Sequence, residues 1–334
     1  MSIPIRSGYR MADLSNWAFP PEMQPKVEQA RFDLEAALDS MVLLRAEVPE
    51  DAFTAGILGT ERIGNGVVIR DDGLVLTIGY LITEATTIWL NTNSGKAVAA
   101  HPLAYDQPTG FGLVQPLGKL GARPLPRGSA ASSSVGDEVV VAGHGGRQHA
   151  LKAKLIAKRE FAGYWEYVLD EALFTSPAHP HWSGAALIGG DGRLLGIGSL
   201  MVQEEIGGRN VQGNMMVPID LLEPILDDLL KLGRAKRAAR PWVGLYATEV
   251  KGHVVVSGLA GGGPAERAGV QVGDLVIEVG GGRVGGLADL FRKIWSLGDA
   301  GVEVPMTLVR EGSVSRVRVP STDRQALLKR PSLH

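Results

Sequence analysis

Residues 181–187 read His-Trp-Ser-Gly-Ala-Ala-Leu, and they lie between an apolar run that ends at Phe174 and another that begins at Leu194. A Ser-Gly step between two expected strands predicts a tight turn, in which the Ser183 hydroxyl is held beside backbone N–H groups. Such a serine is one third of a nucleophilic site, because attack also needs a base and a group that orients the base. The remaining two groups have to come from elsewhere in the sequence.

The composition is that of a globular protein. The protein has 334 residues, 45% of them hydrophobic and 21% charged, which is enough for two or three domains. A formal net charge of −2 gives no sign of a nucleic-acid partner. There is no cysteine, so the protein forms neither disulfides nor cysteine-ligated metal sites.

Neither a secretory signal nor a membrane-spanning segment is recognisable in the sequence. Residues 1–19 lack an apolar core flanked by basic residues, and no run is long enough to span a bilayer. We therefore expect a cytoplasmic protein without a membrane span.

Short apolar runs separated by turn residues recur between Met41 and Pro218. Glycine is abundant, with 44 residues, and aromatic residues make up only 6% of the sequence, which favours turns and short strands. This rhythm, with no helical pattern between the runs, predicts an all-β barrel or sandwich. The runs cover residues 41–44, 66–69, 74–76, 87–90, 139–141, 151–156, 167–169 and 194–197.

Helical spacing flanks this β region. It predicts one helix from Pro25 to Leu38 and another from Ile219 to Lys231. We interpret the basic stretch 231–240 as a solvated linker rather than as a nucleic-acid or membrane patch.

Residues 241–320 have the pattern of a compact second unit. An amphipathic helix is expected at 287–297, because apolar residues recur there at helical spacing. The other expected elements are strands at 243–248, 253–257 and 274–279, a short helix at 264–268, and a hairpin of 303–310 with 314–319.

The two units together resemble the HtrA (high-temperature-requirement) family, whose members are trypsin-like serine proteases followed by a PDZ domain. The resemblance covers roughly residues 40–320, and its most specific part is 263–274, Gly-Pro-Ala-Glu-Arg-Ala-Gly-Val-Gln-Val-Gly-Asp, which looks like the central PDZ signature. Residues 240–245, Arg-Pro-Trp-Val-Gly-Leu, are similar to the entry into PDZ. The first unit matches at 64–69, 73–77 and 136–143.

The resemblance implies a mainly β protein. It has a trypsin-like double six-stranded β-barrel followed by a small α+β PDZ domain, with an N-terminal helical arm. The expected boundaries are 1–38 for the arm and helix, 39–232 for the protease-fold domain, 233–240 for the linker, 241–321 for the PDZ domain and 322–334 for the tail. The resemblance also implies a homotrimer, with Tyr9, Trp17 and Phe19 as candidate interface aromatics.

The sequence departs from the family pattern at the catalytic positions. Tyr80 stands where the family carries its catalytic histidine, and Gly110 stands where it carries its aspartate. Ser183 remains at the nucleophile position. The oxyanion hole of the family uses backbone N–H groups of the serine and of the residue two before it, which here is His181 in place of glycine.

These replacements predict a vestigial nucleophile. A tyrosine phenol has a reference pKa of about 10, so it is protonated at neutral pH and cannot take the serine proton. Gly110 has no side chain with which to orient a base. The hypothesis that follows is a pseudoprotease on a preserved scaffold.

Two alternatives rest on histidines near the serine turn. One of them could serve Ser183 as a base from a new direction, or two could bind a metal, although no acidic residue stands at an obvious partner position. The simplest interpretation is that they are ordinary loop histidines, and that Glu160, Glu166 and Asp170 are surface charges. The histidines are His144, His149, His179 and His181.

By resemblance, the PDZ unit captures the C-termini of other polypeptides. Such a domain takes the partner as an added strand and holds its carboxylate on a loop of backbone N–H groups. The loop here is Trp242, Val243, Gly244 and Leu245, and the groove wall is Leu287 and Phe291. The alternative is a PDZ unit that packs on the barrel and binds no peptide.

The function predicted from the sequence is that of a catalytically degenerate HtrA-like protein in protein quality control. It would bind peptide or protein C-termini as a scaffold, as an adaptor or as a regulator of an active HtrA-type relative, with no cofactor and no bound metal. The alternatives are a serine endopeptidase that uses Ser183 with a non-standard base, and a histidine-based metal-binding pseudoenzyme.

Overall fold

The computed structural model describes residues 17–206 and 208–329, so the candidate interface residue Tyr9 and the end of the tail lie outside the described residues. The protein divides into two compact units. The first takes in the residues up to Arg159, then Glu171–Lys236 and Lys329, and the second comprises Glu160–Asp170 and Arg237–Leu328. Within the described residues, no helix has the length and apolar character needed to cross a membrane.

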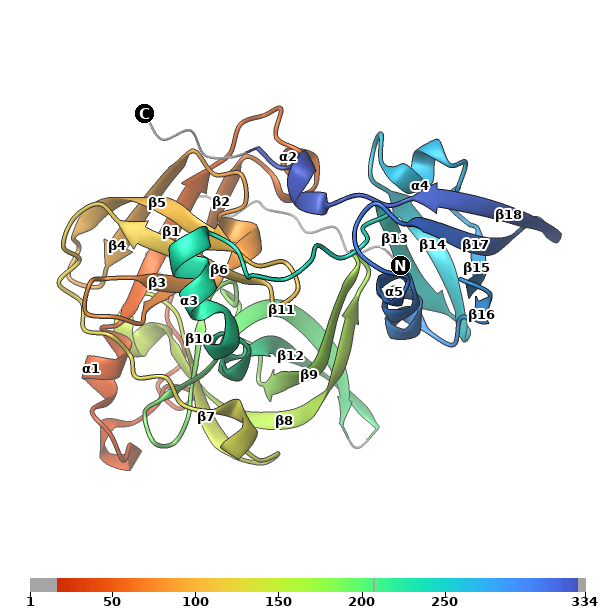
Figure 1. Cartoon of the computed structure of the whole chain (residues 1–334). Coiled ribbons are helices and arrows are strands. Elements are labelled where there is room, and N and C mark those ends of the chain that lie inside the picture. The colour runs from red at the N-terminus through yellow and green to blue at the C-terminus, as the bar shows by residue number, and fades with distance from the viewer. Residues whose placement is uncertain (1–16, 207, 330–334) are drawn as a thin grey trace. The chain divides into compact units, whose positions relative to one another are not determined.

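Two closed, antiparallel six-stranded barrels form the first unit, as the sequence predicted (Figure 1). The first barrel has the strand order β1 (Met41–Glu47), β2 (Glu61–Val68), β3 (Val75–Ile78), β6 (Phe111–Pro116), β5 (Ala97–Tyr105) and β4 (Thr87–Thr92). The second has the order β10 (Ala186–Ile188), β11 (Leu194–Ile206), β12 (Arg209–Pro218), β9 (Tyr167–Ser176), β8 (Ala150–Gly163) and β7 (Glu138–Ala142).

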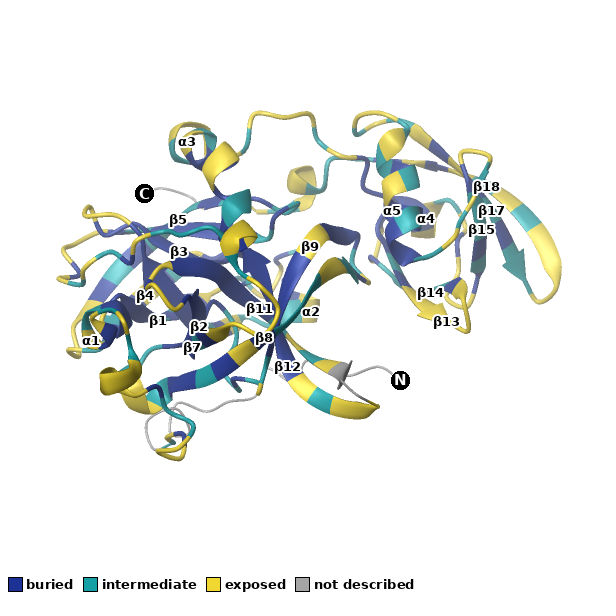
Figure 2. Cartoon of the chain, turned by 90° about the horizontal axis from the view of Figure 1, so that it is seen from below, coloured by how far each residue is buried: buried dark blue, intermediate teal, exposed yellow. Residues whose placement is uncertain are grey.

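Apolar runs become barrel strands because a closed sheet pairs every backbone edge and buries one face of each strand. Strand β3 is buried along its whole length, and Phe111 at the start of β6 and Phe174 in β9 are fully buried. The barrel strands are largely dark blue in Figure 2, whereas their connections are mostly yellow or teal.

The expected helix from Pro25 to Leu38 is wrong. The backbone forms a 3-10 turn, η2 (Val27–Gln29), becomes extended at Ala30, and begins a new five-residue helix, α1 (Leu34–Leu38). The carboxylate of Asp33 accepts the N–H of Ala36, which caps α1 and fixes its start. The remaining helical elements of this unit are α2 (Ala55–Leu58), η3 (Gly79–Leu81), η4 (Ala130–Ser132), η5 (Gly146–His149), η6 (Ile219–Leu221) and α3 (Glu223–Leu232).

The second unit is a small sheet with helices, in which the predicted amphipathic helix is α5 (Leu287–Ser296). Leu290, Phe291 and Ile294 of α5 are fully buried in its core. The strand path is β13 (Leu245–Val250), β14 (His253–Leu259), β15 (Leu275–Val279), β17 (Glu303–Arg310) and β18 (Ser313–Pro320), with β16 (Gly282–Arg283) beside β15. The other helical elements are α4 (Pro264–Arg267) and η7 (Arg324–Leu327).

A backbone contact joins the two barrels at the serine turn. The carbonyl of Ser183 accepts the N–H of Asn65 in β2 at 2.7 Å. The next residue, Gly184, has a φ of 72°, and a Cβ placed there would lie 1.9 Å from the Asn65 carbonyl oxygen. The turn therefore requires glycine at this position.

We expect Gly184→Ala to lower the free energy of unfolding by roughly 2–5 kcal/mol, because it combines backbone strain with a clash. Urea unfolding followed by tryptophan fluorescence measures the change. Gly190→Ala is the matched control, since a Cβ at Gly190 has nothing within 4 Å, and it should change stability by less than about 1 kcal/mol. Equal destabilisation by both variants would contradict the constraint at Gly184.

Candidate functional site

Tyr80 and Ser183 meet where the two barrels adjoin. Tyr80 lies in η3, directly after β3, and Ser183 lies in the connection between β9 and β10. The Tyr80 hydroxyl oxygen is 2.7 Å from Ser183 Oγ, and it also donates to the carbonyl of Ser199 in β11 at 2.9 Å. The side chain at the expected position of the base is therefore a phenol in direct contact with the serine.

The hydrogen-bond directions in this group follow from proton count. A neutral phenol has one O–H, and Tyr80 uses it on the Ser199 carbonyl, which can only accept. The Ser183 hydroxyl therefore donates its own proton to the Tyr80 oxygen. Burial raises the pKa of the Tyr80 phenol above its ordinary value of 10.0, although the hydrogen bond from Ser183 opposes that shift. At neutral pH the phenolate that could accept the serine proton is not populated.

Gly110 lies beside this group without contributing a side chain to it. Its carbonyl accepts the N–H of Gly79 at 2.7 Å, and its φ is 82°. The nearby carboxylate of Asp106 accepts the backbone N–H and the hydroxyl of Thr109, so it closes the turn that precedes Gly110. The position expected to orient a base is thus filled by backbone.

Asn65 holds the serine turn in place from the first barrel. Its side-chain Nδ2 donates to the carbonyls of His181, at 2.9 Å, and Ser183, at 3.3 Å, and its Oδ1 accepts the N–H of His144. Its backbone carbonyl accepts the hydroxyl of Thr77. Asn65 is buried, so these bonds replace its hydration.

The N–H two residues before the serine points at an imidazole. The backbone N–H of His181 donates to Nδ1 of His179 at 3.0 Å, and Nε2 of His179 donates to the carbonyl of His149 at 2.8 Å. His179 is completely buried, and burial lowers its pKa to about 4, so its ring is neutral. The second expected oxyanion donor is therefore already used inside the protein.

Two of the other histidines, His149 and His181, pack against Trp17 of the N-terminal arm. The Trp17 ring stacks on His149 at a centroid distance of 4.7 Å and lies 4.7 Å from His181. Phe19 is buried against His179. The two arm aromatics that we expected at a subunit interface therefore pack within their own polypeptide.

The ring nitrogens of this cluster face backbone groups rather than a common point. Nε2 of His144 lies 3.2 Å from the Thr92 carbonyl, and the two ring nitrogens of His149 lie 3.1 Å and 2.6 Å from the carbonyls of His144 and Trp17. Across residues 17–206 and 208–329, no group of three or more acidic or histidine side chains could hold a metal ion.

The expected carboxylate-binding loop of the second unit is occupied. The carboxylate of Glu166 accepts the backbone N–H groups of Val243, Gly244 and Leu245. Glu166 is 4% exposed, so its interpretation as a surface charge is wrong. The two acidic residues grouped with it, Glu160 and Asp170, do lie at the surface, and both pair with Arg292.

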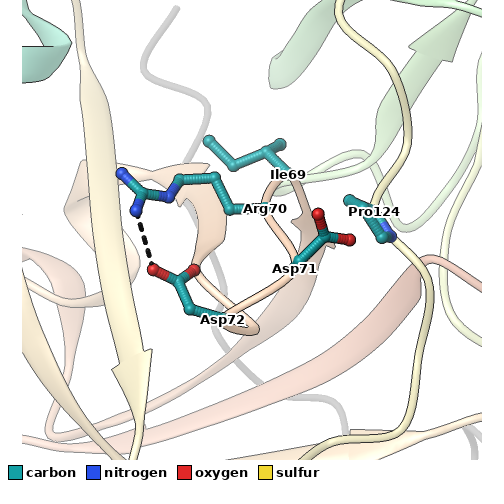
Figure 3. Close-up of a pocket in the computed structure, with 5 residues that line it drawn as sticks. All are labelled: Ile69, Arg70, Asp71, Asp72 and Pro124. Atoms are coloured by element: carbon teal, nitrogen blue, oxygen red, sulfur yellow. Dashed lines mark ion pairs between the residues drawn. The ribbon is translucent and has the colours of Figure 1, made fainter.

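A pocket of about 450 Å³ lies at the turn between β2 and β3 (Figure 3). Arg70 and Asp72 on its wall form an ion pair with an N–O distance of 2.9 Å, and each side chain is nearly half exposed. The pocket is lined by Ile69, Arg70, Asp71, Asp72 and Pro124, none of which belongs to the serine group.

Comparison with known proteins assigns both units. Residues 64–197 match the trypsin-like peptidase domain family, and residues 255–310 match the PDZ domain family. "Probable periplasmic serine endoprotease DegP-like" of Pseudomonas fulva is 24% identical over 292 residues, which cover 81% of this chain and 59% of that protein. "Serine endoprotease DegS" of Salmonella typhimurium is 26% identical over 235 residues, 66% of each protein. The chain is thus similar in sequence and domain order to serine endoproteases of the HtrA type.

Solved structures of proteases share the fold. The HtrA-type protease AlgW with a tripeptide aligns with a TM-score of 0.51 and 17% identity, over 92% of this chain and 97% of that one. The serine endoprotease from Yersinia pestis aligns with a TM-score of 0.50 and 20% identity, over 89% and 96%. This chain spans only 59% and 66% of the length of the two relatives named above.

Several residues that build the site escaped the sequence reasoning. Ser199 contributes only a carbonyl, and Asn65 acts through an amide that reaches across 118 positions, so neither has a local pattern. Glu166 stands in a run of aromatic residues, Tyr164-Trp165-Glu166-Tyr167, which is an unusual setting for a surface charge. This aromatic setting is the sequence signal that could have predicted the burial of Glu166.

A double-mutant cycle tests the contact between Tyr80 and Ser183. We expect Tyr80→Phe and Ser183→Ala each to lower the free energy of unfolding, with a coupling of about 1 kcal/mol between them, since each removes the other's partner. Urea unfolding of the four proteins gives the coupling. Pairing Tyr80→Phe with Ser132→Ala, an exposed hydroxyl, should give additive effects. Additivity in the first cycle would contradict the hydrogen bond.

Stability should depend on pH through His179. Its pKa of about 4 lies below the ordinary 6.5, so the unfolded state binds more protons between these values. The stabilisation from neutral His179 is complete above pH 6.5 and is lost, by up to about 3 kcal/mol, as the pH falls to 4. Unfolding free energies from pH 4 to 7 should show a shallower slope for His179→Gln than for wild type. The exposed His253→Gln should retain the wild-type slope, and a wild-type slope in His179→Gln would refute this assignment.

Proposed function

We propose that this chain is a catalytically degenerate HtrA-family protein that binds peptide or protein segments through its PDZ unit. The observation that carries the proposal is the contact of Ser183 Oγ with the Tyr80 phenol, whose proton is directed at the Ser199 carbonyl. Acyl transfer by serine needs a base that takes the hydroxyl proton as the bond forms. A neutral phenol whose pKa is raised by burial does not supply one.

The second support comes from the oxyanion side. In acyl-transfer enzymes, free N–H groups stabilise the negative charge of the tetrahedral intermediate, and loss of one donor reduces kcat by about 10²- to 10³-fold. The His181 N–H is engaged by His179, and displacing it would leave a buried imidazole nitrogen unpaired. Loss of the catalytic histidine alone reduces kcat by roughly 10⁶-fold in a serine protease. The missing base and the engaged oxyanion donor both act against the attack of the serine on the substrate carbonyl.

The role that remains is binding. A PDZ unit recognises the C-termini of its partners, so the protein would act as a scaffold, as an adaptor or as a regulator of an active HtrA-type relative. We also propose a homo-oligomer, by analogy with the family, and a cytoplasmic location. Light scattering on the purified protein and fractionation of cells address those two points.

A serine endopeptidase is the second candidate, because the curated relatives are named serine endoproteases. It would require a base other than Tyr80 to reach Ser183. In the described part of the protein, Tyr80 is the hydrogen-bond partner of Ser183 Oγ, and the ring nitrogens of His144, His149 and His179 are engaged with backbone groups.

Casein digestion separates the two candidates. We expect the wild-type protein and Ser183→Ala to give the same background release of peptides, and a fluorophosphonate probe to leave Ser183 unlabelled. An active HtrA-type protease assayed in parallel shows that the substrate and probe work. Cleavage that depends on Ser183 at a rate typical of enzymes would end the proposal and establish the endopeptidase.

A further inference from the structure

The tip of the hairpin between β8 and β9 carries a carboxylate that sits on the PDZ loop. Oε1 of Glu166 lies 2.8 Å from the N–H nitrogen of Gly244, 3.1 Å from that of Leu245 and 3.2 Å from that of Val243. Three converging backbone donors are what a PDZ domain offers to the terminal carboxylate of a partner. The residues of the hairpin tip, Glu160–Asp170, belong to the same compact unit as this loop.

The backbone of the hairpin also lies along β13, as the backbone of a bound peptide would. The N–H of Ala247 donates to the carbonyl of Tyr164 at 3.0 Å. Tyr164 thus lies beside Ala247, and Glu166, two residues later in the hairpin, bonds through its carboxylate to the N–H of Leu245, two residues earlier in β13. This antiparallel alignment is that of a peptide added as a strand, with the terminal carboxylate at the loop and the preceding backbone on β13.

Side chains of the hairpin also engage helix α5 and its core. Val168 belongs to the apolar cluster that contains Leu287 and Phe291, the residues expected to line the peptide groove. Arg292 of α5 forms ion pairs with Glu160 and Asp170, one on each arm of the hairpin. The hairpin thus contacts the loop, the strand and the helix that a bound C-terminus would use.

We propose that the β8–β9 hairpin tip is an internal ligand of the PDZ groove, and that a partner with a free C-terminal carboxylate binds by displacing it. This inference rests on the proposed function, since it concerns the peptide site through which the protein is proposed to act. The partner class is a peptide C-terminus with an apolar last residue, because the groove wall is Leu287 and Phe291.

Two features of Glu166 make the internal ligand replaceable. Its φ of 58° lies in the left-handed region, which a non-glycine residue adopts at some energetic cost. Burial raises its pKa to about 7, although the three N–H groups and the charge of Arg324 oppose that shift, and the phenol of Tyr246 lies close enough to interact with it. The α-carboxylate of a peptide, with a reference pKa of about 3.5, remains fully ionised on the same donors.

The test peptide is derived from the hairpin itself. It is Arg-Glu-Phe-Ala-Gly-Tyr-Trp-Val, which copies residues 159–165 and ends in valine with a free carboxylate. The same peptide with a C-terminal amide is the ligand control. Fluorescence anisotropy of the labelled peptide measures its affinity for the full-length protein.

The variant is Glu166→Gly, which removes the carboxylate and suits the positive φ. Glu311→Gly is the matched control, since Glu311 is exposed in the same unit and has a φ of 48°. We expect Glu166→Gly to bind the free-carboxylate peptide at least about tenfold more tightly than wild type, Glu311→Gly to match wild type, and the amidated peptide to bind none of them well. A second readout, without peptide, is hydrogen exchange at the amides of Val243, Gly244 and Leu245, which should be faster in Glu166→Gly than in the other two proteins.

The outcomes distinguish this inference from the proposed function. Equal peptide affinity of wild type and Glu166→Gly would overturn the internal ligand while leaving peptide binding in place. If none of the three proteins binds the peptide, peptide binding is contradicted, and hydrogen exchange at the loop amides tests the internal ligand. Faster exchange in Glu166→Gly alone would support the internal ligand. Unchanged exchange would overturn it as well.

Discussion

The hydrogen bond from the Asn65 N–H to the Ser183 carbonyl is the constraint on which the rest of the first unit depends, because it joins a strand of one barrel to the serine turn of the other. Gly184 follows at a position where a Cβ would overlap the Asn65 carbonyl, so the approach of the two backbones fixes the residue type. These are backbone requirements and do not involve proton transfer. They explain the glycine at position 184 whatever chemistry Ser183 performs.

Three polar groups around Ser183 are paired within the protein. Tyr80 donates to Ser199, Ser183 donates to Tyr80, and the His181 N–H is taken by His179. An active site keeps a base and oxyanion donors available to the substrate, and this leaves some polar groups without full partners until the substrate binds. Here protein groups supply partners to the Ser183 hydroxyl, the Tyr80 phenol and the His181 N–H. Internal satisfaction favours stability and supports the proposed loss of catalysis.

The β-barrels, the PDZ elements and the place of Ser183 could be predicted because strand alternation, turn residues and family motifs are local in sequence. The predicted helix before β1 failed because its apolar spacing suggested one helix, whereas Asp33 caps a separate start at Leu34. Contacts such as Tyr80 to Ser199 and Glu166 to Gly244 join residues 119 and 78 positions apart. No periodicity records such pairs, so the role of Glu166 became visible only when the fold placed it on the PDZ loop.

Tyr80 and Glu166 each occupy a place that an external group would otherwise fill, but they differ in how easily they can leave it. Tyr80 follows a fully buried strand, and moving it would unpair Ser199 and Ser183 inside the barrels. Glu166 sits at the tip of a hairpin whose ion pairs with Arg292 are solvent-exposed, and such pairs contribute little to stability. A competing carboxylate can satisfy the same three N–H groups as the hairpin leaves, so exchange need not pass through an unpaired state. Tyr80 therefore cannot leave the serine site without disrupting the barrels. Glu166, in contrast, can leave the PDZ loop reversibly when another carboxylate takes its place.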